Sequence, residues 1–261
     1  MDIRTIDRAL GARSRGLLLA VVAAAAVLVA SSATTTAGDD SFPLTVVDDE
    51  GTEVTIEALP ERIVSLTPAN TETVFALGAG DRLVGGTDYD DYPPEAAEAT
   101  NVATFTGVIM EQVVALEPDL VLAGGNLLTK PDEIATMREL GYPVVVLYAP
   151  DVSSVMADIE LIGASVGAAE EAAAMTAEMS VQMDAIAEAV AATGSTPRTF
   201  YEVDAEAEIY APAPDSFLAD MIVRAGGEPI TTGDPAAWSI SLEELVVADP
   251  EVIVLGDANY G

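Results

Sequence analysis

Short apolar runs alternate with helical segments along most of the chain, and Gly or Pro residues separate them. A short apolar run without polar alternation suits a parallel strand that is buried on both faces. Strands that alternate with helices in this way predict a parallel sheet. In the first half of the chain, the predicted strands are a β-hairpin at Phe42–Ile56 and single strands at Arg62–Leu66, Leu83–Gly86, Leu120–Ala123 and Pro143–Leu147. The predicted helices are one that follows the capping turn Thr67–Asn70 and ends at Leu77, one at Glu111–Leu116 and one at Pro131–Leu140.

One segment occurs twice in the sequence. Met110–Leu122 and Leu242–Val254 align without a gap at an offset of 132 residues, and Glu111 falls on Glu243. Each copy reads as a short amphipathic helix, a turn that contains Pro, and an apolar strand. Because this offset is too long for a solenoid repeat, the repetition predicts two similar α/β lobes. Two lobes imply a cleft, and clefts are where small ligands bind.

The segment between the two copies has helical character. Val152–Thr193 lacks Pro and is rich in Ala, Glu and Met, with Gly163 and Gly167 as candidate breaks. It is either a packed helix pair within one domain or a long helix that connects the lobes, and its position between the copies favours the second interpretation. The second lobe then resumes with predicted strands at Thr199–Val203 and Val252–Leu255 and a predicted helix at Ser216–Arg224.

These elements divide the chain into four parts: a leader at 1–38, an N-terminal α/β lobe at 39–150, a connecting helical segment at 151–194 and a C-terminal α/β lobe at 195–261. After its copy of the repeat, the first lobe continues with another helix and strand, whereas the chain ends at Gly261 soon after the second copy. We therefore expect the C-terminal lobe to be incomplete, with an edge of its sheet left bare.

The leader has the order of a secretory signal peptide. Four Arg residues precede the unbroken apolar run Leu17–Ala30, and small residues follow it. The alternative is an uncleaved membrane anchor, because the run is only a little shorter than the roughly 18 residues that indicate a span. In both cases we expect the protein to be exported and to work at the extracellular face of the cytoplasmic membrane.

Composition excludes several classes of chemistry. The chain has no Cys and no His, so it lacks thiolate metal ligands, lipid-attachment cysteines and the commonest general base. From Asp39 onward there are 42 acidic and six basic residues, which gives a formal charge of −36. Such a chain has no basic footprint for nucleic acid. Molar salt would screen its self-repulsion, so the composition predicts halophilic adaptation.

Motifs for catalysis are weak. Gly78-Ala79-Gly80 resembles part of a dinucleotide fingerprint, but it closes a helix and is better interpreted as a helix C-cap. Asp88-Tyr89-Asp90-Asp91 is either a carboxylate metal site or an acidic loop, and the loop is favoured because no second acidic strand end lies in register. No nucleophile elbow, phosphate loop or zinc motif is present, so we predict no catalytic residues.

Aromatic residues lie where the predicted strands open into loops. Tyr89 follows the strand that ends at Gly86, Phe105 lies six residues before Glu111, and Trp238 lies five residues before Glu243. In an open α/β sheet, loops at the carboxyl ends of the strands line the ligand crevice. The alternative is ordinary core packing, which their polar, turn-like neighbours weaken. These aromatics therefore indicate a ligand site.

Several blocks in order resemble one known family. Arg62–Pro94 is similar to the opening of the periplasmic-binding-protein family that serves cobalamin and ferric-siderophore ABC importers. Three further regions match later blocks of that family, so the resemblance extends from Phe42 to about Leu255. These regions are Glu111–Ala123, Phe200–Asp204 with Ser216–Gly227, and Ser241–Leu255. The resemblance implies two Rossmann-like lobes with parallel sheets, joined by a single long helix, and no catalysis.

The resemblance also implies residue roles. Glu111 and Glu243 match surface glutamates, one per lobe, that dock onto arginines of the permease dimer; the alternative is two solvated glutamates at helix starts. The predicted ligand-contacting residues are Thr67, Pro68, Tyr89, Phe105, Gly124 and Trp238. Gly124 departs from the cobalamin-binding members, which place a further aromatic just after this strand.

The leading hypothesis is an exported, monomeric binding component that captures cobalamin and delivers it to an ABC permease with its ATPase subunits. It needs no cofactor and no metal. A ferric siderophore of low negative charge is the alternative ligand. Two other classes are a secreted hydrolase that uses Asp88–Asp91 and a structural surface protein. Metal-dependent turnover would indicate the hydrolase, and a crevice without aromatics would indicate the structural protein.

Overall fold

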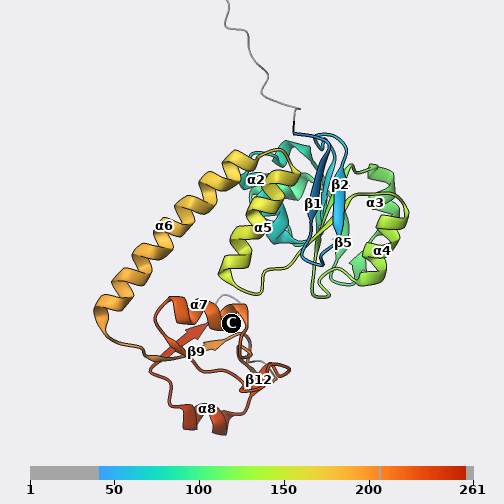
Figure 1. Cartoon of the computed structure of the whole chain (residues 1–261). Helices are drawn as coiled ribbons and strands as arrows, with labels where there is room; N and C mark the ends of the chain where they lie inside the picture. Colours follow the sequence, from blue (N-terminus) through green and yellow to red (C-terminus); the bar gives the residue numbers. More distant parts are fainter. Residues whose placement is uncertain (1–40, 206, 257–261) are drawn as a thin grey trace, which may run out of the picture. The chain divides into compact units, whose positions relative to one another are not determined.

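The computed structural model describes residues 41–205 and 207–256, and its N-terminal half is built on one sheet (Figure 1). The strand order is β6-β5-β4-β3-β7-β8, and every neighbouring pair is parallel except β5 with β6. The strands are β3 (Ile63–Ser65), β4 (Leu83–Thr87), β5 (Thr100–Thr104), β6 (Gly107–Val108), β7 (Leu120–Gly124) and β8 (Val144–Leu147). The carboxyl ends of the parallel strands therefore meet at one edge of the sheet.

Both faces of this sheet are covered. Leu120 and Leu122 of β7 join one hydrophobic cluster, and Val121 and Ala123 of the same strand join a second cluster. Side chains of a strand point alternately to its two faces, so a strand buried on both faces must be apolar throughout. The first cluster receives side chains from α2 (Pro68–Ala76), α5 (Val152–Ser165) and the first part of α6 (Ala169–Thr193). The second receives them from α3 (Met110–Leu116) and α4 (Pro131–Glu139).

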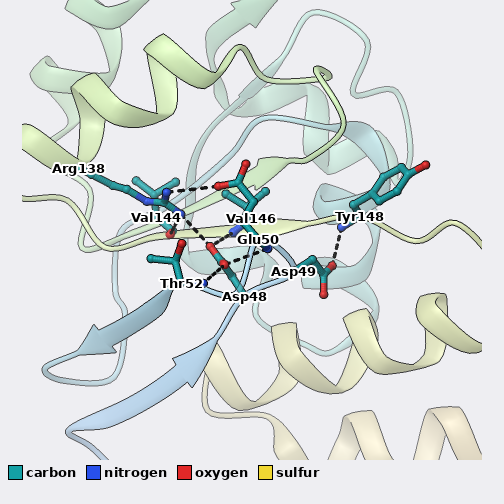
Figure 2. Close-up of polar contacts among 8 residues, drawn as sticks. All are labelled: Asp48, Asp49, Glu50, Thr52, Arg138, Val144, Val146 and Tyr148. Carbon is teal, nitrogen blue, oxygen red and sulfur yellow. Dashed lines mark hydrogen bonds and ion pairs between the residues drawn. The ribbon is translucent and has the colours of Figure 1, made fainter.

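An antiparallel hairpin of β1 (Leu44–Val47) and β2 (Glu53–Ile56) is tied to this half by a buried carboxylate (Figure 2). Asp48 accepts hydrogen bonds from Arg138 Nη2 at 2.7 Å and from the backbone N–H groups of Thr52 at 2.8 Å and Val146 at 3.2 Å. Glu50 forms an outer ion pair with Arg138 at 3.3 Å. One carboxylate therefore connects the hairpin turn, α4 and the edge strand β8.

The helical segment forms two helices. Gly167, with φ +73°, separates α5 from α6 (Ala169–Thr193). A positive φ of this kind favours Gly, which carries no Cβ. Ile159 and Ile162 of α5 lie in the core of the N-terminal half, so α5 packs within that half. In α6 only Ala172 and Thr176 are buried, both near its start. This 25-residue helix is the single long helix that the fold class requires.

The C-terminal half contains a smaller parallel sheet in the order β11-β9-β13. Its core is formed by Phe200, Ala211, Ile230 and Ile240. Its elements are β9 (Arg198–Glu202), β10 (Ile209–Tyr210), α7 (Phe217–Arg224), β11 (Glu228–Pro229), β12 (Ser239–Ile240), α8 (Leu242–Ala248) and β13 (Val252–Leu255). All four residues of β13 are exposed among the described residues, although the corresponding strand β7 is fully buried.

The sequence repeat is also a structural repeat. Helices α3 and α8 both end at a non-Gly residue in the left-handed region, Glu117 with φ 46° and Asp249 with φ 51°, and Pro118 or Pro250 follows. A Pro cannot continue a helix, so it helps to fix the turn into the strand. Glu117 and Asp249, which are 132 residues apart, therefore share a backbone conformation that residues other than Gly seldom adopt.

Each copy also makes the same contact with a neighbouring strand. The backbone N–H of Arg62 donates to Asp119 at 2.8 Å, and that of Arg198 donates to Glu251 at 3.0 Å. In both arginines the guanidinium Nε donates to a carbonyl at the end of the repeat helix, at 2.7 Å and 3.1 Å respectively. The two halves are therefore built from the same unit of strand, helix and strand.

The fold class predicted from the sequence is confirmed: two α/β lobes with parallel sheets joined by one long helix. The hydrophobic pattern missed the short strands β5, β6, β10, β11 and β12. The predicted leader at 1–38 lies outside the described residues, and the domain boundaries stay predictions. Within residues 41–205 and 207–256, no helix combines the length and hydropathy that a membrane span requires.

Candidate functional site

A pocket of about 760 Å³ lies at the carboxyl ends of β3, β4, β5, β7 and β8. The start of α2 forms part of its wall, and Val155 and Ile159 of α5 form another part. Helix α2 begins there because Thr67 accepts a hydrogen bond from the backbone N–H of Asn70 and Pro68 occupies the first turn. The topology of the sheet therefore positions this pocket where open α/β sheets bind ligands.

Five of the six residues predicted to contact a ligand line this pocket: Thr67, Pro68, Tyr89, Phe105 and Gly124. Phe105 is 90% exposed and Tyr89 is 59% exposed, so both present aromatic surface at the pocket instead of packing in the core. Trp238 does not line this pocket. It lies just before β12 in the C-terminal half, where it is half-exposed and its carbonyl accepts a hydrogen bond from Ala211 N.

Gly124 ends β7 in a crowded position. A Cβ at this residue would lie 2.6 Å from Thr67 Cγ2 and 2.8 Å from Leu128 Cβ, closer than real Cβ atoms approach their neighbours. An aromatic side chain here would require Thr67 and Leu128 to move, which accounts for the departure from the expected pattern. Leu127 and Leu128 of the following loop are highly exposed and line the pocket instead. The apolar surface expected after this strand is therefore supplied by the loop.

The tip that carries Phe105 is held by a pair of charged residues. Phe105 and Thr106 form a two-residue turn between β5 and β6. Lys130, the only lysine in the sequence, donates from Nζ to Thr106 O at 2.6 Å and to Glu133 Oε1 at 3.2 Å. Glu133 Oε1 also accepts from the backbone N–H of Val108 at 3.2 Å. The exposed aromatic tip is thus connected to the start of α4.

The acidic loop after β4 has a structural use. Asp90 is buried and accepts hydrogen bonds from Thr71 Oγ1 at 2.9 Å, from Thr87 N at 2.8 Å and from Thr87 Oγ1 at 2.8 Å. These bonds fix the loop on which Tyr89 lies. In the part of the chain that the structure describes, no group of acidic side chains has the arrangement of a metal site. The geometry therefore favours the acidic loop over the carboxylate metal site.

Sequence reasoning missed Tyr148, which also lines the pocket and is half-exposed. Its backbone N–H donates to Asp49 Oδ2 at 2.6 Å, and its ring points away from the cluster around Asp48 (Figure 2). A usable signal was present, because Tyr148 directly follows the predicted strand Pro143–Leu147. The same rule that selected Tyr89 would have selected it.

Asp158 of α5 is an acidic residue on the pocket wall. Its pKa is raised to about 7, mainly by burial and also by a hydrogen bond with the nearby carboxylate of Asp49 and by charge repulsion from it. Below this pH the side chain is neutral. Among the described residues that line the pocket, none is a lysine or an arginine.

Glu111 and Glu243 occupy equivalent positions in the first turns of α3 and α8. Both are exposed, and neither makes a hydrogen bond or ion pair with any described residue. In α8 the capping box uses Ser241 and Glu244, which leaves the Glu243 carboxylate free. The two carboxylates are therefore available to a partner.

A largely apolar pocket with exposed aromatics, at the strand ends of one lobe of a two-lobed α/β fold, is characteristic of small-molecule-binding proteins. The family model described as "Periplasmic binding protein" matches residues 63–259. The chain belongs to this family of solute-binding proteins.

Relatives and solved structures agree with this assignment. The chain is 31% identical to the ABC transporter substrate-binding lipoprotein YvrC of Bacillus subtilis, over 83% of this chain and 70% of that protein. It is 33% identical to a cobalamin-binding protein of Halobacterium salinarum, over 83% of this chain and 59% of that protein. It therefore spans less than two thirds of the Halobacterium protein's length.

Two solved structures are similar at 27% identity. The periplasmic vitamin B12 binding protein BtuF of Vibrio cholerae superposes with a TM-score of 0.69, over 78% of this chain and 80% of that chain. The periplasmic heme-binding protein BhuT, in complex with two hemes, superposes with a TM-score of 0.68, over 77% of this chain and 79% of that chain. Structures similar to this chain are thus named for two different ligands, vitamin B12 and heme.

Proposed function

We propose that this protein is the extracytoplasmic substrate-binding component of an ABC importer and that it captures cobalamin. One observation carries the choice of ligand: the pocket of about 760 Å³ is lined by exposed aromatic and aliphatic side chains and by no basic side chain. A corrinoid offers a broad apolar ring surface to such a wall, and its ring substituents are mostly neutral amides. The similarity to the cobalamin-binding protein of Halobacterium salinarum supports the same choice.

The alternative ligand is a heme or a ferric siderophore, and the 27% identity to a heme-binding protein favours it. Both ligand types commonly carry carboxylates or other anionic groups, which would enter this pocket without a cationic partner. The chain also lacks His, a common ligand of heme iron. These points support cobalamin over the alternative.

Delivery requires a membrane partner. In our proposal, Glu111 and Glu243 dock onto arginines of a permease dimer, with one carboxylate from each half of the chain. The protein acts as an exported monomer, without catalytic residues or a resident cofactor. Trp238 contributes a second aromatic surface to the ligand from the C-terminal half. The exposure of both glutamates supports this arrangement.

Equilibrium dialysis of cyanocobalamin against the protein in molar KCl tests the proposal, with hemin as a second ligand. We expect a Kd of about 1 μM or tighter, which corresponds to roughly −8 kcal/mol. Tyr89→Ala should weaken binding, whereas Tyr92→Ala should not, because Tyr92 is exposed on the same loop but does not line the pocket. The affinity of Trp238→Ala for cyanocobalamin shows whether the C-terminal half contributes to ligand binding.

If a chain that circular dichroism shows to be folded binds hemin and not cyanocobalamin, the corrinoid assignment is wrong. Binding of neither ligand would refute the proposed function for this chain.

A further inference from the structure

Two buried polar atoms on the pocket wall lack partners. Among the described residues, three buried side-chain nitrogen or oxygen atoms make no hydrogen bond: Asn70 Nδ2, Glu133 Oε2 and Arg138 Nε. Asn70 and Glu133 both line the pocket, whereas Arg138 belongs to the Asp48 cluster. Buried polar groups in folded proteins are nearly always satisfied, and exceptions call for an explanation. Two of the three exceptions therefore coincide with the candidate ligand site.

Asn70 supplies an unused donor. It is 7% exposed, and it lies in the first turn of α2 with its backbone N–H bonded to Thr67 Oγ1 at 3.4 Å. Thr73, three residues later on the same helix, also lines the pocket. Residues spaced by three share one face of a helix, so Asn70 lies on the face of α2 that borders the pocket. Its side-chain N–H groups can donate to an oxygen acceptor of a ligand.

Glu133 supplies an unused acceptor. Its Oε1 accepts from Lys130 Nζ and from Val108 N, both at 3.2 Å, and these contacts orient the carboxylate. Its side chain is 17% exposed, and Oε2 has no donor. A carboxylate accepts hydrogen bonds and, when ionised, has no proton to donate. An N–H group of a ligand would satisfy Oε2, whereas a ligand carboxylate beside it would be repelled.

We propose that Asn70 and Glu133 determine the specificity of this pocket by selecting ligands whose periphery carries neutral carboxamides over ligands that carry carboxylates. A primary carboxamide presents both a carbonyl acceptor and N–H donors. It therefore matches the unused donor of Asn70 and the unused acceptor of Glu133. This inference rests on the proposed function, because cobalamin carries several primary carboxamides around its corrin ring.

Both side chains can present these atoms to a ligand. Both atoms are buried, so each reaches a ligand after a rotation of its terminal group. For Asn70 this torsion has a broad energy well and the rotation costs little, whereas for Glu133 the rotation also loosens the Oε1 contacts with Lys130 and Val108. A ligand carboxylate, in contrast, finds no lysine or arginine among the described residues that line the pocket, and it meets a second acidic residue, Asp158. The nearby Lys130 is already engaged by Thr106 O and Glu133 Oε1. Rejection of a ligand that leaves buried charges unpaired is a strong source of selectivity.

The test compares cyanocobalamin with its monocarboxylic acid isomers, in each of which one ring carboxamide has been hydrolysed to a carboxylate. Equilibrium dialysis in molar KCl gives the Kd of each form for the wild type and three variants. The wild type should bind cyanocobalamin at least about tenfold tighter than one of the acid isomers. Glu133→Gln should largely remove that preference, because the variant should bind the acid isomer more tightly than the wild type does. Asn70→Ala should weaken the binding of cyanocobalamin by about tenfold.

Glu139→Gln is the matched control, because Glu139 lies on the same helix, is exposed and does not line the pocket. Thermal unfolding verifies that each variant folds, and Glu133→Gln keeps the test decisive if Asn70→Ala does not fold. Equal affinity of the wild type for cyanocobalamin and every acid isomer would overturn the inference and leave the proposed function intact. The same holds if Glu139→Gln shifts the preference as much as Glu133→Gln. Failure of the folded wild type to bind any corrinoid would overturn both.

Discussion

Replacing the buried Asp48 should destabilise the protein far more than replacing Glu50, the outer carboxylate of the same cluster (Figure 2). The Asp48 side chain has no solvent exposure, and it pairs with Arg138 at 2.7 Å. Asp48→Ala removes this ion pair and three hydrogen bonds, which Asp48 accepts from the backbone N–H groups of Glu50, Thr52 and Val146. Water can replace the bonds at the exposed hairpin turn, but it cannot easily reach Val146 N in the buried strand.

The magnitude follows from what is left behind. A buried N–H without a partner costs about 1–3 kcal/mol, and loss of one member of a buried ion pair costs about 3–5 kcal/mol. Arg138 keeps 28% of its side-chain exposure, so solvation offsets part of the second cost. We therefore expect Asp48→Ala to lower the free energy of unfolding by about 3 kcal/mol. Asp48→Asn keeps one acceptor and should cost less.

Urea unfolding in 2 M KCl, followed by circular dichroism, measures the effect. Glu50→Gln is the control, because the Glu50 carboxylate makes only the outer ion pair with Arg138, at 3.3 Å and with both side chains partly exposed. Such a pair contributes at most about 1 kcal/mol. If Asp48→Ala and Glu50→Gln cost the same, the assignment of a structural role to the buried carboxylate is wrong.

Three further predictions follow from other parts of the chain. Because burial and the nearby Asp49 carboxylate raise the Asp158 pKa to about 7, the folded state holds this proton more tightly than the unfolded state. The contribution of Asp158 to stability should therefore fall as the pH rises from about 4 to about 7. The urea midpoint of Asp158→Asn should lack this dependence on pH. Gly124→Ala places a Cβ 2.6 Å from Thr67 Cγ2, so it should cost about 1–3 kcal/mol in unfolding; an unchanged midpoint would contradict this. Glu111→Arg with Glu243→Arg should leave ligand affinity unchanged and reduce the ATP hydrolysis that the protein stimulates in a reconstituted transporter, and undiminished stimulation would exclude docking.

Much of the architecture could be read from the sequence because burial on two faces leaves a strong signal. An uninterrupted apolar run such as Leu120–Ala123 is hard to satisfy except in a covered parallel sheet. The repeat gave a second signal, since the positions of Pro118 and Pro250 fix the same turn in each half. Short strands such as Thr100–Thr104 were missed because two of their residues are exposed and their composition is that of a loop.

The candidate site was predicted less completely. Strand ends pointed to Tyr89 and Phe105, because loops at those ends converge in this fold. The contribution of Leu127 could not be predicted, since it depends on a loop in which this residue adopts a positive φ of 69°. Glu133 also carries no sequence signal. It reaches the pocket only because α4 starts beside the β5–β6 tip, 25 residues earlier in the chain.

The position of Lys130 makes the protein convenient to label. Because it is the only lysine, an amine-reactive dye can be attached to one known side chain, apart from the chain's α-amino group. Its side chain is half-exposed, and Nζ lies 2.6 Å from Thr106 O, next to the Phe105 tip. A dye placed there would report ligand entry by a change in emission, without any engineered cysteine. Acylation removes the positive charge of Nζ and its contacts with Thr106 O and Glu133, so the same atom is both the attachment point and the anchor of the aromatic tip.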